Sequence, residues 1–436
     1  MKKRVLSANG TAGSIPALIL CFSTILASSC QLIVWPIEHL WEKAYSGDTS
    51  IDAHGLLENG SGGYIISGQT TSFGSAATKL ASDIWIANAD ANGKLLWQKR
   101  LENGKRGSTV FSCENTRDGG YLIAGSEGLG SDSILAESQG LILKIDQSGT
   151  LSTQKILAVA NPDMPWILEG IPRASFIRSV SETRDGFICL VQTGQDWAIV
   201  KLDSAFSVVW KKLFDSGYSD YLYSQAKCSD ESIIVCGFFN GYLALMKIDS
   251  AGLILWQKRY GALSQKASII AEGDGGFLVY GSGTVLRIDA EGQVLASAII
   301  DLPKQGFLLP PQALPSTEGS FLVSFGDGVL FKLDSAFDIR WQRRYPLIYG
   351  IAYAQKGNIL ILCRLPTETK IRMAELNDSG ELPGSNLQLN SVYYRSTRTN
   401  IQEVAFESPA IDPRVEISDA VLSLKDSSAK VEAVYF

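Results

Sequence analysis

One phrase recurs along the chain at a nearly constant interval, and this repeat limits the fold more than any other feature of the sequence. An apolar strand follows a turn of the type Asp-Gly-Gly, and the next apolar strand ends in Lys-Leu-Asp or Lys-Ile-Asp before a stretch that ends in Trp-x-Lys. The residue that closes the Lys-Leu-Asp phrase, or its counterpart, recurs at Asp90, Asp146, Asp203, Asp249, Asp289, Asp334 and Asn377. The mean interval of about 48 residues is the length of one four-stranded propeller blade.

The repeat predicts an all-β chain, a seven-bladed β-propeller of four-stranded antiparallel blades. Seven units cover roughly residues 51–384, and an extra copy of the fourth-strand phrase, Trp41–Gly47, precedes them. Because the last unit has a weak fourth strand, we expect Trp41–Gly47 to pair with residues 371–376 and close the ring, which removes an open sheet edge. The recurring aspartates stand in turns that suit tight hairpins, so we interpret them as structural and not as a catalytic set.

The phrase Ala89–Trp97 resembles the tryptophan-docking motif of quinoprotein-like (PQQ-like) propeller repeats, as found in secreted bacterial propellers and lipoproteins. In that family a strand ending in Trp packs between blades, which implies the same role for Trp97, Trp210, Trp256 and Trp341. The family includes quinone dehydrogenases and a scaffold lipoprotein of the outer-membrane barrel-assembly machinery. Quinone enzymes of this type carry an adjacent pair of cysteines, and this sequence has none. We therefore expect no cofactor.

The N-terminus has the pattern of a secretory signal. Lys2, Lys3 and Arg4 precede the apolar run Ile15–Leu26, which is too short to span a bilayer. Two processing schemes are open: ordinary signal-peptidase cleavage, or a lipobox-like site in which Cys30 becomes the lipidated first residue, although Leu26 lies one position farther from it than usual. Five cysteines remain after Cys21 and Cys30, and an odd number at irregular spacings favours free thiols over a disulfide framework.

The sequence thus divides into four parts. We expect a signal peptide at 1–29, a linker after the lipidation site at 30–40, the propeller at 41–390 and a C-terminal extension at 391–436. The extension contains no glycine. It fits one or two strands added to the propeller, a poorly ordered tail, or an interaction arm.

Long loops on one face of a rigid ring are where a ligand is expected to bind. Two of these loops carry apolar residues among prolines, and we propose as candidate binding residues Met164, Trp166, Ile167, Glu169, Phe307 and Leu308. In the second of these loops, Leu309 directly follows Phe307 and Leu308. The alternative is that these residues cover the core or plug the channel.

Chemistry that needs several histidines is excluded, because only His39 and His54 are present. We predict no metal site and no catalytic residues. A formal net charge of −6 disfavours nucleic acid as a partner. We expect a non-catalytic, extracytoplasmic lipoprotein at the bacterial envelope, or otherwise a secreted protein, that binds a protein or a glycan. The alternative is a carbohydrate-active hydrolase that uses carboxylates such as Asp163 and Glu169.

The lipidation of Cys30 is directly testable. If Cys30 is lipidated, the Cys30→Ser variant moves from the detergent fraction to the aqueous fraction and loses the mass of the lipid. A variant that stays in the detergent fraction with unchanged mass contradicts the lipobox interpretation.

Overall fold

The computed structural model describes most of the chain between Leu40 and Ala433. The described ranges are 40–46, 50–70, 82–102, 107–128, 138–160, 175–194, 196–215, 220–239, 241–261, 266–273, 275–302, 309–316, 318–354, 357–385, 387, 394–399, 403–405, 410–411, 414–419, 423–426 and 430–433. All of them belong to the compact unit Leu40–Phe436. The predicted signal peptide, Cys30 and most of the predicted linker lie outside the described residues.

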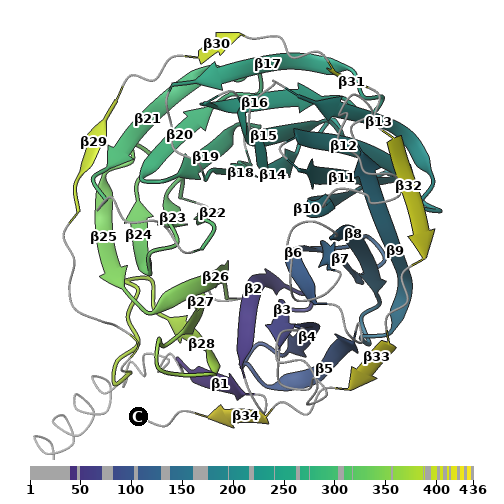
Figure 1. The fold of residues 1–436 in the computed structure, drawn as a ribbon. Helices are drawn as coiled ribbons and strands as arrows, with labels where there is room; N and C mark the ends of the chain where they lie inside the picture. Colours follow the sequence, from purple (N-terminus) through teal and green to yellow (C-terminus); the bar gives the residue numbers. More distant parts are fainter. Residues whose placement is uncertain are drawn as a thin grey trace, which may run out of the picture. The chain divides into compact units, whose positions relative to one another are not determined.

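The described residues form seven antiparallel sheets and no helix, which confirms the predicted seven-bladed propeller (Figure 1). Blade 1 consists of β2 (Ile51–Glu58), β3 (Tyr64–Thr70), β4 (Asp83–Ala89) and β5 (Leu95–Glu102). Blade 2 consists of β6 (Ser108–Asn115), β7 (Tyr121–Glu127), β8 (Gln139–Ile145) and β9 (Leu151–Ala160). Blade 3 consists of β10 (Ser175–Thr183), β11 (Gly186–Thr193), β12 (Asp196–Asp203) and β13 (Val208–Phe214). Blades 4 and 5 consist of β14 (Tyr221–Lys227), β15 (Ile233–Phe239), β16 (Tyr242–Ile248) and β17 (Ile254–Tyr260); and β18 (Ser268–Ala271), β19 (Phe277–Gly281), β20 (Thr284–Ile288) and β21 (Val294–Ile300). Blades 6 and 7 consist of β22 (Gln312–Pro315), β23 (Phe321–Ser324), β24 (Val329–Leu333) and β25 (Ile339–Arg344); and β26 (Leu347–Tyr353), β27 (Ile359–Arg364), β28 (Ile371–Leu376) and β1 (Glu42–Ser46).

The ring closes as the repeat predicts. Strand β1 pairs with β28 in antiparallel register, with Glu42 opposite Ala374 and Tyr45 opposite Ile371. The Tyr45 hydroxyl donates to the carbonyl oxygen of Gly93 in blade 1, at 2.7 Å. The N-terminal strand is therefore bonded both to the last blade and to the first.

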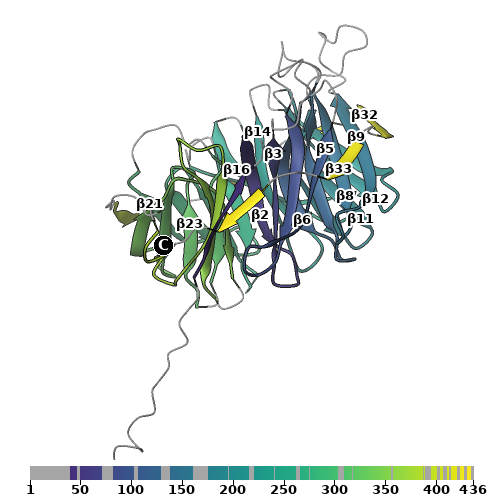
Figure 2. The same ribbon diagram turned by 90° about the horizontal axis from the view of Figure 1, so that it is seen from below.

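The C-terminal extension runs around the outside of the ring (Figures 1 and 2). Its strands are β29 (Ser396–Arg398), β30 (Glu403–Ala405), β31 (Ala410–Ile411), β32 (Arg414–Asp419), β33 (Ser423–Asp426) and β34 (Lys430–Ala433). They add a fifth strand to blades 5, 4, 3, 2, 1 and 7 in that order, and on blade 6 the Tyr394 backbone bonds to the Gln342 side chain. We call Tyr394 and strands β29–β34 the C-terminal belt. It has more strands than the one or two expected from the sequence.

Tryptophans on or just before the fourth strands join a blade to the next at five of the seven interfaces, in the role that the resemblance implied. The Trp97 indole donates to the backbone oxygen of Gln147 at 2.8 Å, and its ring lies over Gly149 in the turn of blade 2. A Cβ on Gly149 would come within 2.9 Å of that ring, and the φ of +83° also favours glycine there. The same contact recurs between Trp41 and Gly93, Trp210 and Gly252, Trp256 and Gly292, and Trp341 and Gly380.

At the two remaining interfaces, between blades 2 and 3 and between blades 5 and 6, other residues stand in place of both the tryptophan and the glycine. Blades 2 and 5 carry Thr153 and Ala296 at the tryptophan position, and the turns that follow carry Phe206 and Phe337 at φ values of 64° and 67°. Phe206 stacks on Phe187 of its own blade with ring centroids 4.5 Å apart. A small residue on one blade is thus matched by an aromatic residue from the next.

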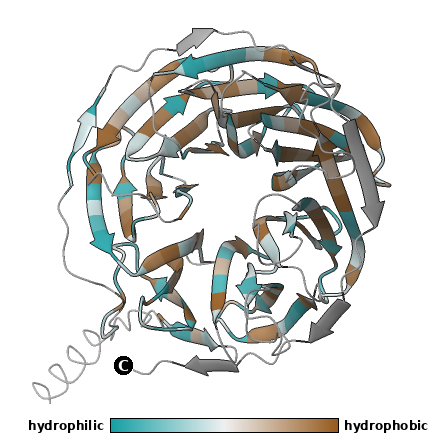
Figure 3. Ribbon diagram, viewed as in Figure 1, coloured by the Kyte–Doolittle hydropathy of each residue, from teal (hydrophilic) through white to brown (hydrophobic). Residues whose placement is uncertain are grey.

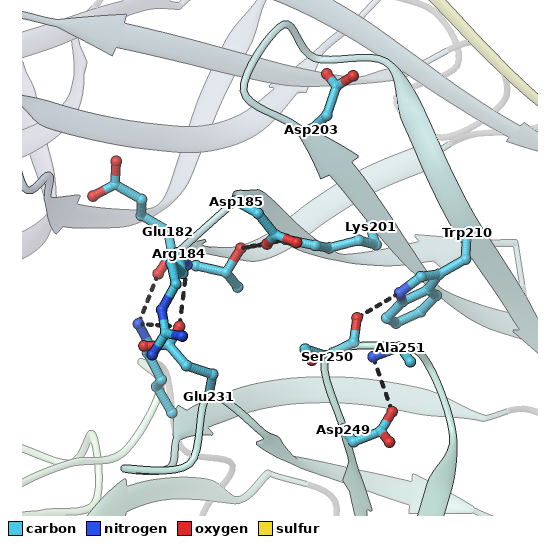
Figure 4. A network of polar contacts seen from close by, with 12 residues as sticks. Glu182, Arg184, Asp185, Lys201, Asp203, Trp210, Glu231, Asp249, Ser250 and Ala251 are labelled. Atoms are coloured by element: carbon cyan, nitrogen blue, oxygen red, sulfur yellow. Dashed lines mark hydrogen bonds and ion pairs between the residues drawn. The ribbon is translucent and has the colours of Figure 1, made fainter.

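The recurring aspartates are turn residues. The Asp249 carboxylate accepts hydrogen bonds from the backbone N–H groups of Ala251 and Leu253, at 3.0 and 2.7 Å, while the Trp210 indole reaches the carbonyl of Ser250 (Figure 4). Comparable side-chain bonds occur at the other six positions. These bonds account for the aspartates without any catalytic role.

The core lies between the blades. Seven clusters of buried apolar side chains are built mainly from the second and third strands of neighbouring blades. Hydrophilic residues are more frequent on fourth strands such as β17 and β25 (Figure 3). The five cysteines of the propeller are free thiols, of which Cys189, Cys236 and Cys363 are buried as expected.

The pairing of residue types at the blade interfaces is testable by exchanging one type for the other. Trp97→Thr removes a large aromatic contact, and Gly149→Phe clashes with Trp97, so each change alone should lower stability by about 2–4 kcal/mol. The double variant has the combination of residue types that blades 2 and 3 carry at Thr153 and Phe206, and it should recover at least half of the summed loss in a calorimetric unfolding experiment. Trp97→Thr combined with the distant Gly252→Phe is the control and should be additive. Additive losses in both pairs would contradict the account.

Candidate ligand site in the central channel

The innermost strands of the seven blades surround the channel, and five of them carry a one-residue β-bulge at the same register (Figure 1). The bulged residues are His54 of β2, Phe111 of β6, Arg178 of β10, Tyr223 of β14 and Tyr349 of β26. Strands β18 and β22 pair without a bulge. A bulge turns a side chain away from the regular alternation of a strand, and such bulges are frequent beside binding sites.

All five bulged residues line one cavity of about 580 Å³. The other lining residues come from the first part of each innermost strand or just before it, including Ser112, Tyr221, Ser268 and Gln312. The cavity therefore lies at the end of the channel where the chain enters each blade. The sequence predicts long, ligand-binding loops at this end of the blades. The volume lies within the range of small-molecule sites.

Arg178 is the main cationic group of this cavity. Its guanidinium lies over the Phe111 ring at 4.7 Å from the centroid and near the Phe176 ring at 5.6 Å. The Nε atom is buried and has no hydrogen-bond partner. Burial lowers the pKa of Arg178 from its ordinary value, and the nearby Tyr223 opposes this shift. The aromatic rings hold the guanidinium in place without neutralising it.

Two further polar groups of the cavity lack partners. The Nε2 atom of His54 and the hydroxyl of Ser112 are buried without a hydrogen bond. Burial also lowers the pKa of His54, while the carboxylate of Asp52 acts in the opposite direction. A neutral imidazole is therefore expected near pH 7. Buried polar groups normally find a partner, so three unpartnered groups around one cavity point to a ligand that supplies the bonds.

Two tyrosines of β14 form a flat surface at the cavity wall. The rings of Tyr221 and Tyr223 are stacked, with centroids 6.4 Å apart and an interplanar angle of 16°. Tyr221 is 39% exposed, which is unusual for a large aromatic side chain in this protein. Burial raises the pKa of Tyr223, so its hydroxyl stays protonated at neutral pH. The tyrosine pair offers an apolar face together with hydroxyl groups.

A chain of polar side chains connects the innermost strands of blades 2, 3 and 4. The Ser181 hydroxyl donates to Glu114 at 2.8 Å, and the Gln225 amide donates to Ser181 at 3.0 Å and to Ser179 at 3.2 Å. Burial raises the pKa of Glu114 to about 7, despite the opposing effects of the Ser181 bond and Lys227. Glu114 does not itself line the cavity.

The described residues that line the cavity include no aspartate and no glutamate. No group of His, Cys, Asp or Glu side chains in the described part of the chain is arranged to hold a metal ion. Nor does that part of the chain hold a helix with the length and apolar character needed to cross a membrane.

The candidate binding residues named from the sequence lie outside the described residues. These are Met164, Trp166, Ile167, Glu169, Phe307 and Leu308, and Asp163 lies outside as well. Leu309, the next residue along the chain, lines the cavity. Of the five bulged residues, only His54 stands out in the sequence, as one of its two histidines, and no motif points to Phe111, Arg178, Tyr223 or Tyr349. Each bulged residue precedes a glycine or serine, a signal that an alignment of the seven units would have shown.

Comparisons with known proteins support the fold. No protein-family model matches the chain, and no curated protein matches it. Among solved structures, virginiamycin B lyase from Staphylococcus aureus is similar, with 16% identity, a TM-score of 0.51 and coverage of 77% of this chain and 99% of that chain. The Dos1 propeller has 11% identity, a TM-score of 0.47 and coverage of 77% and 95%. A protein of unknown function from Bacteroides caccae has 16% identity, a TM-score of 0.39 and coverage of 63% and 92%.

At these identities the likeness to the lyase shows a shared propeller architecture and nothing about activity. The resemblance to quinoprotein-like repeats stays a prediction from the sequence.

The raised pKa of Glu114 predicts a pH dependence of stability. An unfolded glutamate titrates near 4.5, so between about pH 4.5 and 7 the folded protein binds a proton that the unfolded chain has lost. The free energy of unfolding then falls as the pH rises through this window, and the loss is complete above about pH 7. Glu114→Gln keeps an acceptor for Ser181 and removes the charge. Its melting temperature relative to wild type should rise by several degrees between pH 5 and pH 8, whereas the exposed control Glu318→Gln should show no such trend. A pH-independent difference for Glu114→Gln would contradict the assignment.

Proposed function

We propose that this protein is a non-catalytic binding propeller that holds a protein or glycan ligand at the long-loop end of its channel. The observation that carries this proposal is the cavity formed by His54, Phe111, Arg178, Tyr223 and Tyr349. Its wall combines aromatic faces, the cationic side chains of Arg178 and Lys266, and unpartnered hydrogen-bonding groups. These are the features of a recognition site, in which a few polar groups fix the orientation of a ligand against apolar surfaces.

The fold supports such a role. The inner strands belong to blades that are locked to one another through tryptophan contacts and encircled by the C-terminal belt. Side chains on this ring are held in place before the ligand arrives, so less conformational entropy is lost on binding. A preorganised wall is an advantage for a scaffold that must recognise its partner without changing shape.

The hydrolase alternative has less support. Glycoside hydrolysis usually requires two carboxyl groups about 5–10 Å apart on either side of the scissile bond. No described residue of the cavity wall carries a carboxyl group, and the nearby Glu114 is bonded to Ser181. The observed wall therefore favours binding over hydrolysis.

The proposed location is the bacterial envelope. The N-terminal sequence supports secretion, and a lipid on Cys30 would tether the propeller to a membrane. A tethered ring presents its channel to neighbouring proteins or glycans at high local concentration. Without the lipid, the same propeller would be secreted and would bind in solution.

A site-specific photo-crosslinker tests the binding end. A benzoylphenylalanine at Tyr221 lies at the cavity, whereas one at Leu253 lies in a tight turn of the same blade and is 63% exposed. In native envelopes the Tyr221 probe should yield a discrete adduct that the Leu253 probe does not, and Tyr223→Ala should reduce its yield several-fold. Equal adducts at both positions, or none at Tyr221, would contradict a ligand at this end.

A further inference from the structure

The unpartnered polar groups of the cavity indicate which class of ligand it binds. An inference about that class rests on the proposed binding function. We infer that the cavity binds a sugar unit that carries a carboxylate, as in a uronic acid, with Arg178 paired to that carboxylate. The described part of the chain offers no acidic partner for Arg178 in an ion pair. Among the described residues this charge therefore carries the cost of a partly buried, unpaired cation, and an anionic ligand would remove that cost.

The geometry of Arg178 suits a carboxylate. Its guanidinium carbon lies 4.7 Å from the centroid of the Phe111 ring and 5.6 Å from that of Phe176, and the two rings meet edge to face at 89°. The rings contact the guanidinium without accepting its N–H groups as a carboxylate would, and its buried Nε has no hydrogen-bond partner. An arginine edge pairs with a planar carboxylate through two parallel hydrogen bonds, an arrangement that a lysine cannot reproduce.

The remaining wall suits a sugar ring. Sugars have apolar C–H faces and hydroxyl groups around the edge. The stacked Tyr221 and Tyr223 provide a flat aromatic surface for such a face. The unpartnered His54 imidazole and Ser112 hydroxyl lie on β2 and β6, the inner strands of the two blades that precede the blade of Arg178, and they offer hydrogen bonds to sugar hydroxyls.

An acidic peptide is the main competing occupant, because its carboxylate would also pair with Arg178. Its backbone amides also offer hydrogen bonds, but a peptide lacks the flat C–H face that matches the stacked tyrosines and the ring of hydroxyl groups that matches the imidazole and the serine. The combination of a flat aromatic surface, neutral donors and acceptors, and a cation without an acidic partner among the described residues therefore favours the acidic sugar.

The test compares matched ligands by isothermal titration calorimetry on the full-length protein. The probes are trigalacturonic acid, its fully methyl-esterified form, the neutral maltotriose and a triglutamate peptide. Wild type should bind trigalacturonic acid at least 10-fold more tightly than the ester or maltotriose, and the affinity should fall as salt is raised. The peptide should bind more weakly than the acidic sugar.

Variants assign the effect to Arg178. Arg178→Met keeps the apolar stem and should weaken binding of the acid by about 100-fold, and Arg178→Lys should retain part of the affinity. Arg340→Met is the control, since Arg340 is 67% exposed and pairs with Asp334 in a turn outside the cavity; it should bind like wild type. Melting curves show whether each variant is folded. If Arg178→Met does not fold, Arg178→Lys provides the test instead. The ratio of its affinities for trigalacturonic acid and for the methyl ester should fall toward one.

Several results would overturn the inference. Equal binding of the acid and the ester, unchanged binding in Arg178→Met, preference for the peptide, or no binding of any sugar would each do so. None of these results contradicts the proposed binding role. That role is tested by the position of the cross-linked adduct, which does not depend on the chemical class of the ligand.

Discussion

The contact between a fourth-strand indole and the turn glycine of the next blade fixes how each blade sits on its neighbour. The pair Trp97 and Gly149 illustrates this contact. The indole ring packs on the Gly149 backbone, where no Cβ is present, and the indole N–H donates to the carbonyl oxygen of Gln147 in the same turn. Where a blade has Thr153 in place of tryptophan, Phe206 in the following turn supplies the aromatic ring. The position of every inner strand, and therefore the shape of the channel, depends on these matched pairs.

Ring closure uses strands from both ends of the described chain. The N-terminal strand β1 lies between β28 of the last blade and β34 of the C-terminal belt, so three distant parts of the sequence share one sheet. The belt visits the blades in the reverse of their chain order, and its strands cover the outer edges of six sheets. Exposed sheet edges promote association between molecules, and a covered edge removes that hazard.

The sequence predicted the ring well because its blades repeat. The spacing of the aspartates predicts the number of blades, and the extra fourth-strand phrase at Trp41 predicts how the ring closes. Both predictions are possible because each uses a local pattern that recurs along the chain. The belt was underestimated because its strands are short, lack the repeat and form only by pairing with distant edges. The bulged residues were missed because adjacent blades carry different side chains there, from His54 to Arg178; only the small residue after each one is shared.

The central claim is that the bulged inner strands form a ligand site, and hydrogen–deuterium exchange tests it most directly. Exchange is measured with and without trigalacturonic acid at saturating concentration. A ligand bound in the channel should slow exchange in peptides that cover β2, β6, β10 and β14, with no change in the fourth strands or the belt. Protection confined to the outer strands, or uniform across the ring, would contradict a site in the channel.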